Sequence, residues 1–108
     1  MIVTHKIYNR STGHPKPEDA LLVIEVADSS LSLDRTIKAR AYALAEVKEY
    51  WIINLNDRKI EVYLNPSVTT GDYASINHYT ETQTFDSPFN GPTVVAELLP
   101  EREPQEEE

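Results

Sequence analysis

The sequence predicts an α/β fold in which one helix flanks a mixed sheet. A continuous apolar run at residues 21–26 is typical of a strand that is buried on both faces. Residues 31–45 repeat apolar side chains at helical spacing, and two alternating segments follow them. The resulting order of strand, helix and three strands favours a parallel pair joined by a right-handed crossover and extended by antiparallel strands.

The first two elements follow from composition and length. Residues 1–17 are polar and end in a proline-rich stretch, so we expect a loop there, with a short strand at residues 2–7. Residues 21–26 are too few for an ordinary helix and are rich in β-branched side chains, which favours a strand. The polar residues that follow predict a break before the helix.

The predicted helix at residues 31–45 begins next to Ser30 and Ser32, either of which can cap it. Several alanines after residue 38 raise its helix propensity. One apolar stripe follows its length, formed by Leu33, Ile37, Ala41 and Leu44. We expect this stripe to pack on the sheet and to cover one face of the first long strand.

Residues 50–55 and 59–64 predict a β-hairpin, because the Asn and Asp between them suit a turn. The second strand alternates, with an apolar face expected to be buried and a face carrying Glu61 and Tyr63 expected to be half exposed. Tyr50 and Trp51 are expected in the core. A further strand is predicted at residues 73–79, a loop at 86–92 and a short apolar element at 94–99.

Length and composition indicate one small domain of 108 residues without cysteine. We divide it into an N-terminal loop or short strand (1–17), a core (18–100) and a disordered acidic tail (101–108). No apolar run approaches the roughly 20 residues of a membrane helix. We therefore expect a cytoplasmic protein with no membrane contact.

The charge is uneven along the chain. Residues 1–17 hold three basic residues and no acid, residues 18–100 hold six basic and thirteen acidic residues, and residues 101–108 hold one arginine and five glutamates. The net charge of −8 does not attract phosphate by its overall field, which counts against tight nonspecific binding of nucleic acid. It does not exclude a nuclease, because carboxylates can bind divalent cations that bridge to phosphate.

Glu25 is the most informative residue, because it stands inside a run that is predicted to be buried on both faces. A buried carboxylate without a partner costs several kcal/mol or becomes protonated. A functional interpretation makes Glu25 a metal ligand or a catalytic acid. A structural interpretation, an edge position or a pair with Lys or Arg, is equally compatible with the sequence.

Lys38 lies on one helix face with Asp34 and Tyr42, beside the predicted apolar stripe. It could reach the end of the sheet and stabilise a phosphate transition state next to a metal at Glu25. Taken alone, an exposed Asp34–Lys38 pair is the more common arrangement. The three histidines have no metal-ligand spacing, and there is no glycine-rich phosphate loop or nucleophile elbow.

These residues, in order, resemble a known family. The run at residues 17–26, then Ser29, Asp34, Lys38 and Tyr42, and then Glu-Tyr-Trp at residues 49–51, are similar to the Uma-two family of restriction endonucleases in the PD-(D/E)XK nuclease superfamily. The likeness covers residues from about 17 to the last strand. It implies a restriction-endonuclease-like mixed sheet with flanking helices, a central metal site and DNA as partner.

The resemblance assigns roles to particular positions. Glu25 matches the second acid of the family's site and would bind the metal, and Lys38 matches a lysine that has moved to the helix, since Ala27 stands at the usual lysine position. Asp34 and Tyr42 match positions without an assigned role. Glu46 stands where the family usually has glycine, so we expect the end of the helix to be reshaped.

The family's first aspartate has no counterpart in residues 1–17. Asp19 does not replace it, because six residues of extended strand place it roughly 20 Å from Glu25. We therefore expect a partial, N-terminally truncated domain that binds Mg²⁺ or Mn²⁺ weakly and cleaves DNA poorly.

Three functions remain open on the sequence. The first is a metal-dependent DNA endonuclease with Glu25 and Lys38 as catalytic residues. The second is a catalytically inactive relative that acts as a binding module, and the third is a protein-interaction domain. We also expect a possible homodimer, because the truncated sheet would leave one face of the first long strand uncovered.

Overall fold

A computed structural model describes residues 2–5 and 22–101 of the chain. Five strands form one sheet in the order β1-β2-β3-β4-β5. Their bounds are Ile2–His5 (β1), Leu22–Ala27 (β2), Glu49–Asn54 (β3), Lys59–Ser67 (β4) and Asp72–Thr80 (β5). β2 and β3 are parallel and every other neighbouring pair is antiparallel, so the predicted mixed sheet is confirmed.

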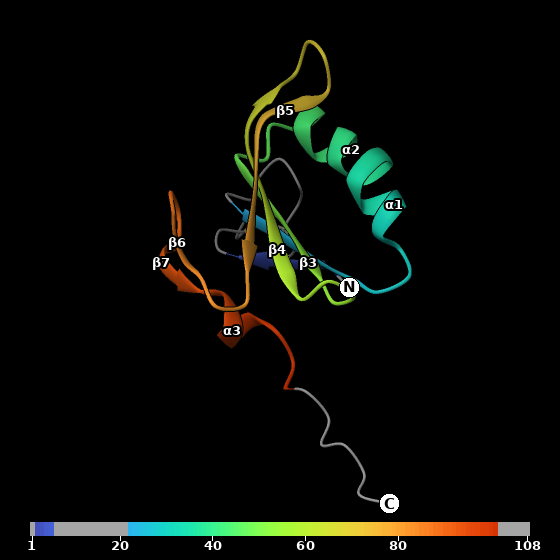
Figure 1. Cartoon of the computed structure of the whole chain (residues 1–108). Coiled ribbons are helices and arrows are strands. Elements are labelled where there is room, and N and C mark those ends of the chain that lie inside the picture. Colours follow the sequence, from blue (N-terminus) through green and yellow to red (C-terminus); the bar gives the residue numbers. More distant parts are fainter. Residues whose placement is uncertain (1, 6–21, 102–108) are drawn as a thin grey trace, which may run out of the picture.

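A single helical segment connects the two parallel strands. It consists of α1 (Leu31–Leu33), the π-helix η2 (Asp34–Lys38) and α2 (Ala39–Leu44). Figure 1 shows this helix on one side of the sheet, with the C-terminal elements on the other side. Those elements are the hairpin of β6 (Thr84–Ser87) and β7 (Gly91–Val94), followed by α3 (Val95–Leu98).

The sheet separates two hydrophobic clusters. The cluster on the helix side contains Tyr50 and Ile52 of the sheet together with Tyr42 and Ala43 of α2. The cluster on the other side contains Trp51 and the C-terminal residues Phe85, Val95 and Leu99. Tyr50 and Trp51, neighbours in β3, therefore belong to opposite faces, as the two-residue period of a strand requires.

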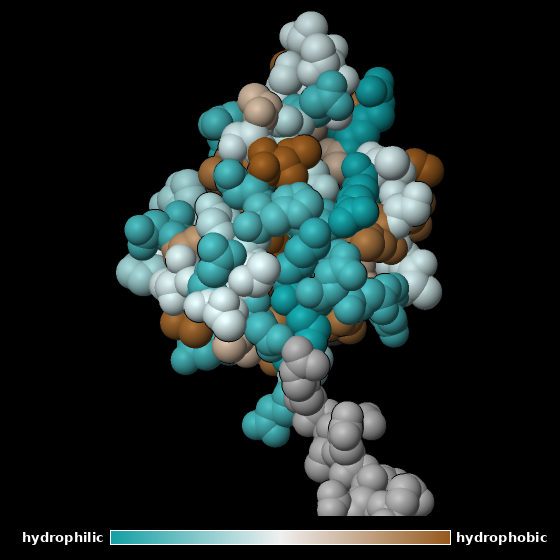
Figure 2. Space-filling view, viewed as in Figure 1, coloured by the Kyte–Doolittle hydropathy of each residue, from teal (hydrophilic) through white to brown (hydrophobic). Residues whose placement is uncertain are grey.

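The predicted position of the helix is confirmed, but the face that it was expected to bury is wrong. Leu33, Ile37 and Leu44 are 43%, 66% and 45% exposed. Figure 2 shows hydrophobic residues at the surface on the side where the helix lies. The buried face instead carries Asp34, Ala39, Tyr42 and Ala43. Small alanines let the helix approach the sheet closely, and the Tyr42 hydroxyl donates to Glu25 on β2.

Three further expectations are also wrong. Glu61 and Tyr63 are 0% and 5% exposed rather than half exposed, because the helix covers their face of β4. Residues 86–92, expected as a loop, contribute to both strands of the β6–β7 hairpin. That hairpin and α3 cover the second face of β2 at Leu22. The expected uncovered face of this strand, which was the reason for predicting self-association, is therefore not found there. A homodimer stays a prediction without that support.

The end of the helix is not reshaped, although Glu46 stands where the resemblance led us to expect glycine. Glu46 adopts a left-handed conformation with φ 61°. Its amide donates to the Ala43 carbonyl (3.0 Å), and the Val47 amide donates to the Tyr42 carbonyl (3.0 Å). These two bonds form a Schellman motif, which normally favours glycine at the left-handed position. Glu46 therefore holds a strained conformation that the rest of the helix end imposes.

Most of the predicted N-terminal loop and nearly all of the predicted acidic tail lie outside the described residues. The division into three segments therefore stays a prediction. Among the helices of the described part, none is long and apolar enough to span a membrane.

Candidate active site

Glu25 lies on β2, an inner strand of the sheet, and its side chain is fully buried. Tyr42 donates a hydrogen bond from its hydroxyl to Glu25 Oε2 at 2.9 Å. The Lys38 ammonium nitrogen lies 3.5 Å from each of the two carboxylate oxygens. The predicted proximity of Glu25 and Lys38 is therefore confirmed, and Tyr42 joins them.

Asp34 brings a second buried carboxylate to the same lysine. Its Oδ1 atom lies 3.2 Å from Lys38 Nζ, and Ser30 donates a hydrogen bond to Oδ2 at 3.0 Å. The ion pair to Oδ1 does not have the geometry of a hydrogen bond, so this oxygen accepts none from the described residues. Asp34, which had no assigned role in the sequence, is thus part of the site.

Charge and burial shift several pKa values in this cluster. The contact with Asp34, and then the charge of Glu25, raises the pKa of the Lys38 ammonium despite some desolvation. Burial raises the pKa of Tyr42, and its hydrogen bond to Glu25 adds to this effect. Lys38 is therefore a cation and Tyr42 a neutral donor at any pH near 7.

The π-helix lies at the site itself. η2 begins at Asp34 and ends at Lys38, and its first carbonyl accepts a hydrogen bond from the Tyr50 hydroxyl at 2.9 Å. Short π-helical turns within α-helices are rare and are frequent at functional sites. In this chain the turn directs Asp34, Arg35 and Lys38 toward carboxylates or into the buried interface with the sheet.

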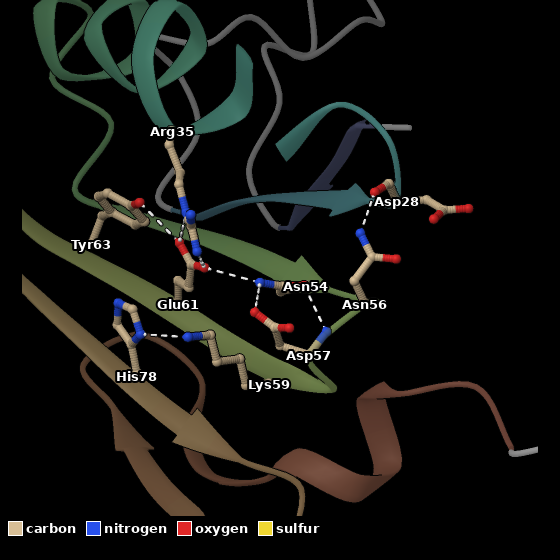
Figure 3. Close-up of polar contacts among 9 residues, drawn as sticks. All are labelled: Asp28, Arg35, Asn54, Asn56, Asp57, Lys59, Glu61, Tyr63 and His78. Atoms are coloured by element: carbon tan, nitrogen blue, oxygen red, sulfur yellow. Dashed lines mark hydrogen bonds and ion pairs between the residues drawn. The ribbon is translucent and has the colours of Figure 1, made fainter. Parts of the chain in front are cut away.

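A second buried glutamate, Glu61 of β4, lies on the same face of the sheet. Arg35 donates from Nε to Glu61 Oε1 at 3.0 Å and from Nη2 to Oε2. Tyr63 donates to Oε1 at 3.1 Å and Asn54 to Oε2 at 3.3 Å. Figure 3 shows these three side chains converging on the Glu61 carboxylate from the helix, β3 and β4.

These bonds decide the protonation state of Glu61. Burial alone would raise the pKa of Glu61, but the hydrogen bonds from Arg35 and Asn54 together lower it below the ordinary value. Sequence reasoning missed this cluster because it treated Glu61 as half exposed. The signal was available, since Glu61 is an acid between Ile60 and Val62 in a strand, just as Glu25 is an acid within an apolar run.

The polar residues at the turn between β3 and β4 support this arrangement. Asn54 Nδ2 lies 3.3 Å from Asp57 Oδ2, and Asn56 donates to the Asp28 carbonyl at 2.6 Å (Figure 3). The exposed pair Lys59 and His78 has a nitrogen–nitrogen distance of 3.0 Å. The Asn56 contact ties the turn to the end of β2, the Lys59–His78 contact joins β4 to β5, and neither involves Glu25.

The cluster fits a hard divalent cation in the kind of atoms that it offers. Glu25 and Asp34 provide carboxylate oxygens, the ligands that Mg²⁺ and Mn²⁺ prefer, and Asp34 Oδ1 is buried without a hydrogen bond. The number of ligands is low, since residues 2–5 and 22–101 contain no group of three Asp, Glu, His or Cys side chains placed to hold a metal. Asp19 lies outside these residues.

A mixed sheet with a buried strand carboxylate and a lysine on the following helix is consistent with the restriction-endonuclease-like α/β class. The sequence matches the model of the Uma2 family, described as "Putative restriction endonuclease", over residues 1–97. The chain therefore belongs to the Uma2 family, whose description suggests nuclease activity and DNA as the partner. No curated protein matches the sequence.

Proposed function

We propose that this domain acts on DNA by endonucleolytic phosphodiester hydrolysis, with Glu25 and Lys38 as its catalytic residues. The observation that carries the proposal is the contact between the Lys38 ammonium and the buried Glu25 carboxylate, 3.5 Å apart. A carboxylate beside a lysine, together with membership of an endonuclease family, supports metal-assisted hydrolysis.

Each side chain has a distinct role in this proposal. Glu25 would hold Mg²⁺ or Mn²⁺, which when bound polarises the phosphate and activates water. Lys38, kept protonated by two carboxylates, would orient the water or stabilise the negative charge that develops on the phosphate. Tyr42 holds the Glu25 carboxylate in place through its hydrogen bond.

We further propose that residues 1–108 bind the metal weakly and cleave DNA poorly. The strand carboxylate is fully buried and already engaged by Tyr42 and Lys38. Because the site has few protein ligands, water must fill most of the coordination positions of a hard cation, and this lowers the affinity for the metal. No acid in residues 1–17 adds to the site.

The test measures binding and cleavage separately. Purified 1–108 is incubated with supercoiled plasmid and millimolar Mg²⁺ or Mn²⁺, and its affinity for a fluorescent duplex is measured as a function of salt. We expect salt-dependent binding with slow nicking or none. Robust cleavage that Glu25→Ala removes would contradict the impairment, and absence of both binding and cleavage would contradict a function on DNA.

A second candidate, a binding module without catalysis, is favoured by the contacts that engage Glu25 and Glu61 within the protein. Lys38 and Tyr42 engage Glu25, and Arg35, Asn54 and Tyr63 engage Glu61. DNA binding that is unchanged by Glu25→Gln, with no cleavage under any metal, would favour this module. Slow nicking that Glu25→Gln abolishes would favour the enzyme.

A further inference from the structure

We propose that Asp34 is the second ligand of the cation site and that the Lys38 ammonium occupies this site as an internal competitor of divalent cations. The inference rests on the proposed function in taking Glu25 as a ligand. It goes further in giving Asp34 a role and in making Lys38 the residue that closes the site.

The first support is the arrangement of three carboxylate oxygens around one ammonium. Tyr42 donates to Glu25 Oε2 and Ser30 donates to Asp34 Oδ2. Lys38 Nζ lies 3.5 Å from both Glu25 oxygens and 3.2 Å from Asp34 Oδ1. One oxygen of each carboxylate thus accepts from a neutral donor, and among the described contacts the other, Glu25 Oε1 or Asp34 Oδ1, has the ammonium alone.

The second support is Asp34 Oδ1, whose contact is the Lys38 ammonium at 3.2 Å. This atom is buried and accepts no hydrogen bond from the described residues. A buried acceptor without a hydrogen bond is unfavourable, and native structures contain few of them. Coordination of a cation would satisfy this oxygen without a directional donor.

The third support is the charge balance. Two buried carboxylates face one ammonium, so one negative charge is left uncompensated when both acids are ionised. A divalent cation in the position of the ammonium would balance both carboxylates. Hard cations of this kind bind proteins through one or two carboxylates and keep several waters, so two ligands suffice for a site.

The fourth support is access. The carboxyl side chains of Glu25 and Asp34 are fully buried, whereas the Lys38 side chain is 32% exposed. Lys38 therefore stands between the two acids and solvent on a flexible stem. Rotation of this one side chain outward would open the site and leave the helix in place.

These observations identify a hard divalent cation as the ligand of the site between Glu25 and Asp34. A phosphate group that attracts the displaced ammonium would favour the open state, so metal and phosphate should strengthen each other's binding. Lys38 would then contact the phosphate only when the metal has taken its place between the carboxylates. Without ligands, Lys38 therefore occupies the site, and the metal and the phosphate together displace it.

The experiment measures Mn²⁺ binding by electron paramagnetic resonance of the free ion, without DNA. We expect Lys38→Met, which keeps an unbranched side chain without its charge, to bind Mn²⁺ at least ten times more tightly than the wild type. Adding Asp34→Asn to Lys38→Met should return the affinity to the wild-type level or below. Lys48→Met removes the same charge from an exposed position and should leave the affinity unchanged.

A folded Lys38→Met variant that binds Mn²⁺ no more tightly than the wild type would overturn the role of Lys38. An unchanged affinity after Asp34→Asn would overturn the role of Asp34. If Lys38→Met is unfolded without metal, refolding by Mn²⁺ supports the proposal. If Mn²⁺ does not refold it, Lys38→Gln, which keeps a neutral donor group, is measured instead. The proposal is overturned if Lys38→Gln binds Mn²⁺ no more tightly than the wild type.

The two proposals fail separately. Tight Mn²⁺ binding by Lys38→Met without DNA cleavage by any variant would retain the cation site and reject the nuclease. Metal-dependent cleavage that needs Glu25 but is indifferent to Asp34→Asn would retain the nuclease and reject the second ligand.

Discussion

Glu25 and Glu61 lie in one row of the sheet, because both pair with Ile52 of the strand between them. Two strand spacings place their backbones roughly 10 Å apart. Both are fully buried, and each accepts a hydrogen bond from a tyrosine. Each is also contacted by a basic residue, and both basic residues belong to the π-helix η2. The two positions differ in how completely the carboxylate is satisfied.

Glu61 is saturated and Glu25 is not. Arg35 makes two hydrogen bonds to Glu61, and Asn54 and Tyr63 add one each. Glu25 has one short hydrogen bond and a lysine at 3.5 Å, and that lysine is shared with Asp34. A planar guanidinium matches a carboxylate in two directions, whereas an ammonium is a mobile point charge. Glu61 therefore stabilises the fold, and Glu25 is the acid that remains able to exchange its cation.

The largest expected effect concerns the basic partners. Arg35→Met would leave the buried Glu61 carboxylate without its charge partner and should lower the free energy of unfolding by about 3 kcal/mol. Lys38→Met should cost less, because the ion pairs that it breaks are longer, and Mn²⁺ should restore part of the loss. Urea unfolding with and without Mn²⁺ measures both. Recovery of Arg35→Met by Mn²⁺ would mean that the two glutamates are not different in kind.

The acid side of the stability profile tests the saturation of Glu61. Its folded pKa lies below the ordinary 4.5, so it contributes stability above that pH, and the contribution is lost as pH falls through the folded pKa. Glu61→Gln should cost about 2 kcal/mol at neutral pH, since it replaces charged hydrogen bonds by neutral ones. Its stability should decline less steeply than that of the wild type below pH 4.5. Parallel curves, measured by urea unfolding at each pH, would show that Glu61 contributes nothing to the acid limb.

The pattern of elements was predictable from the sequence because it depends on local periodicity. The apolar run of β2, the helical segment, and the hairpin of β3 and β4 each follow from spacing within a few residues. Glu25 was predictable as a candidate for the same reason, since an acid within an apolar run stands out wherever the chain goes. Its proximity to Lys38 followed from the position of that lysine beside the apolar stripe of the next helix, and the resemblance to the family assigned the lysine a role.

Orientation of the helix was not predictable from the stripe of Leu33, Ile37 and Leu44. Hydrophobic periodicity assumes that the apolar face is buried, but here polar contacts across the sheet interface set the orientation. Arg35 and Glu61 are 26 residues apart, and no local pattern connects them. The saturated glutamate was missed because its partners come from three separate elements.

Glu46→Gly tests whether the end of the helix is energetically coupled to the contacts of Glu25 or Glu61. Glycine removes the strain of φ 61° and should raise the free energy of unfolding by about 0.5–1 kcal/mol. The gain should be the same in the wild type, in Arg35→Met and in Lys38→Met, because Glu46 contacts neither basic residue in the described hydrogen bonds and ion pairs. Unequal gains in thermal unfolding experiments would mean that the helix end couples to one position.

The smallest effect is expected at Ile37, which lies between Arg35 and Lys38 in sequence but faces solvent with 66% exposure. Ile37→Gln should change the free energy of unfolding by less than about 0.5 kcal/mol, since little apolar area is buried there. The substitution thus controls for changes to η2 itself, because it alters the π-helix without touching either carboxylate. A loss near 2 kcal/mol, the range for burial of a whole isoleucine side chain, would mean that the stripe is covered in solution. The losses at Arg35 and Lys38 could then not be assigned to Glu61 and Glu25 alone.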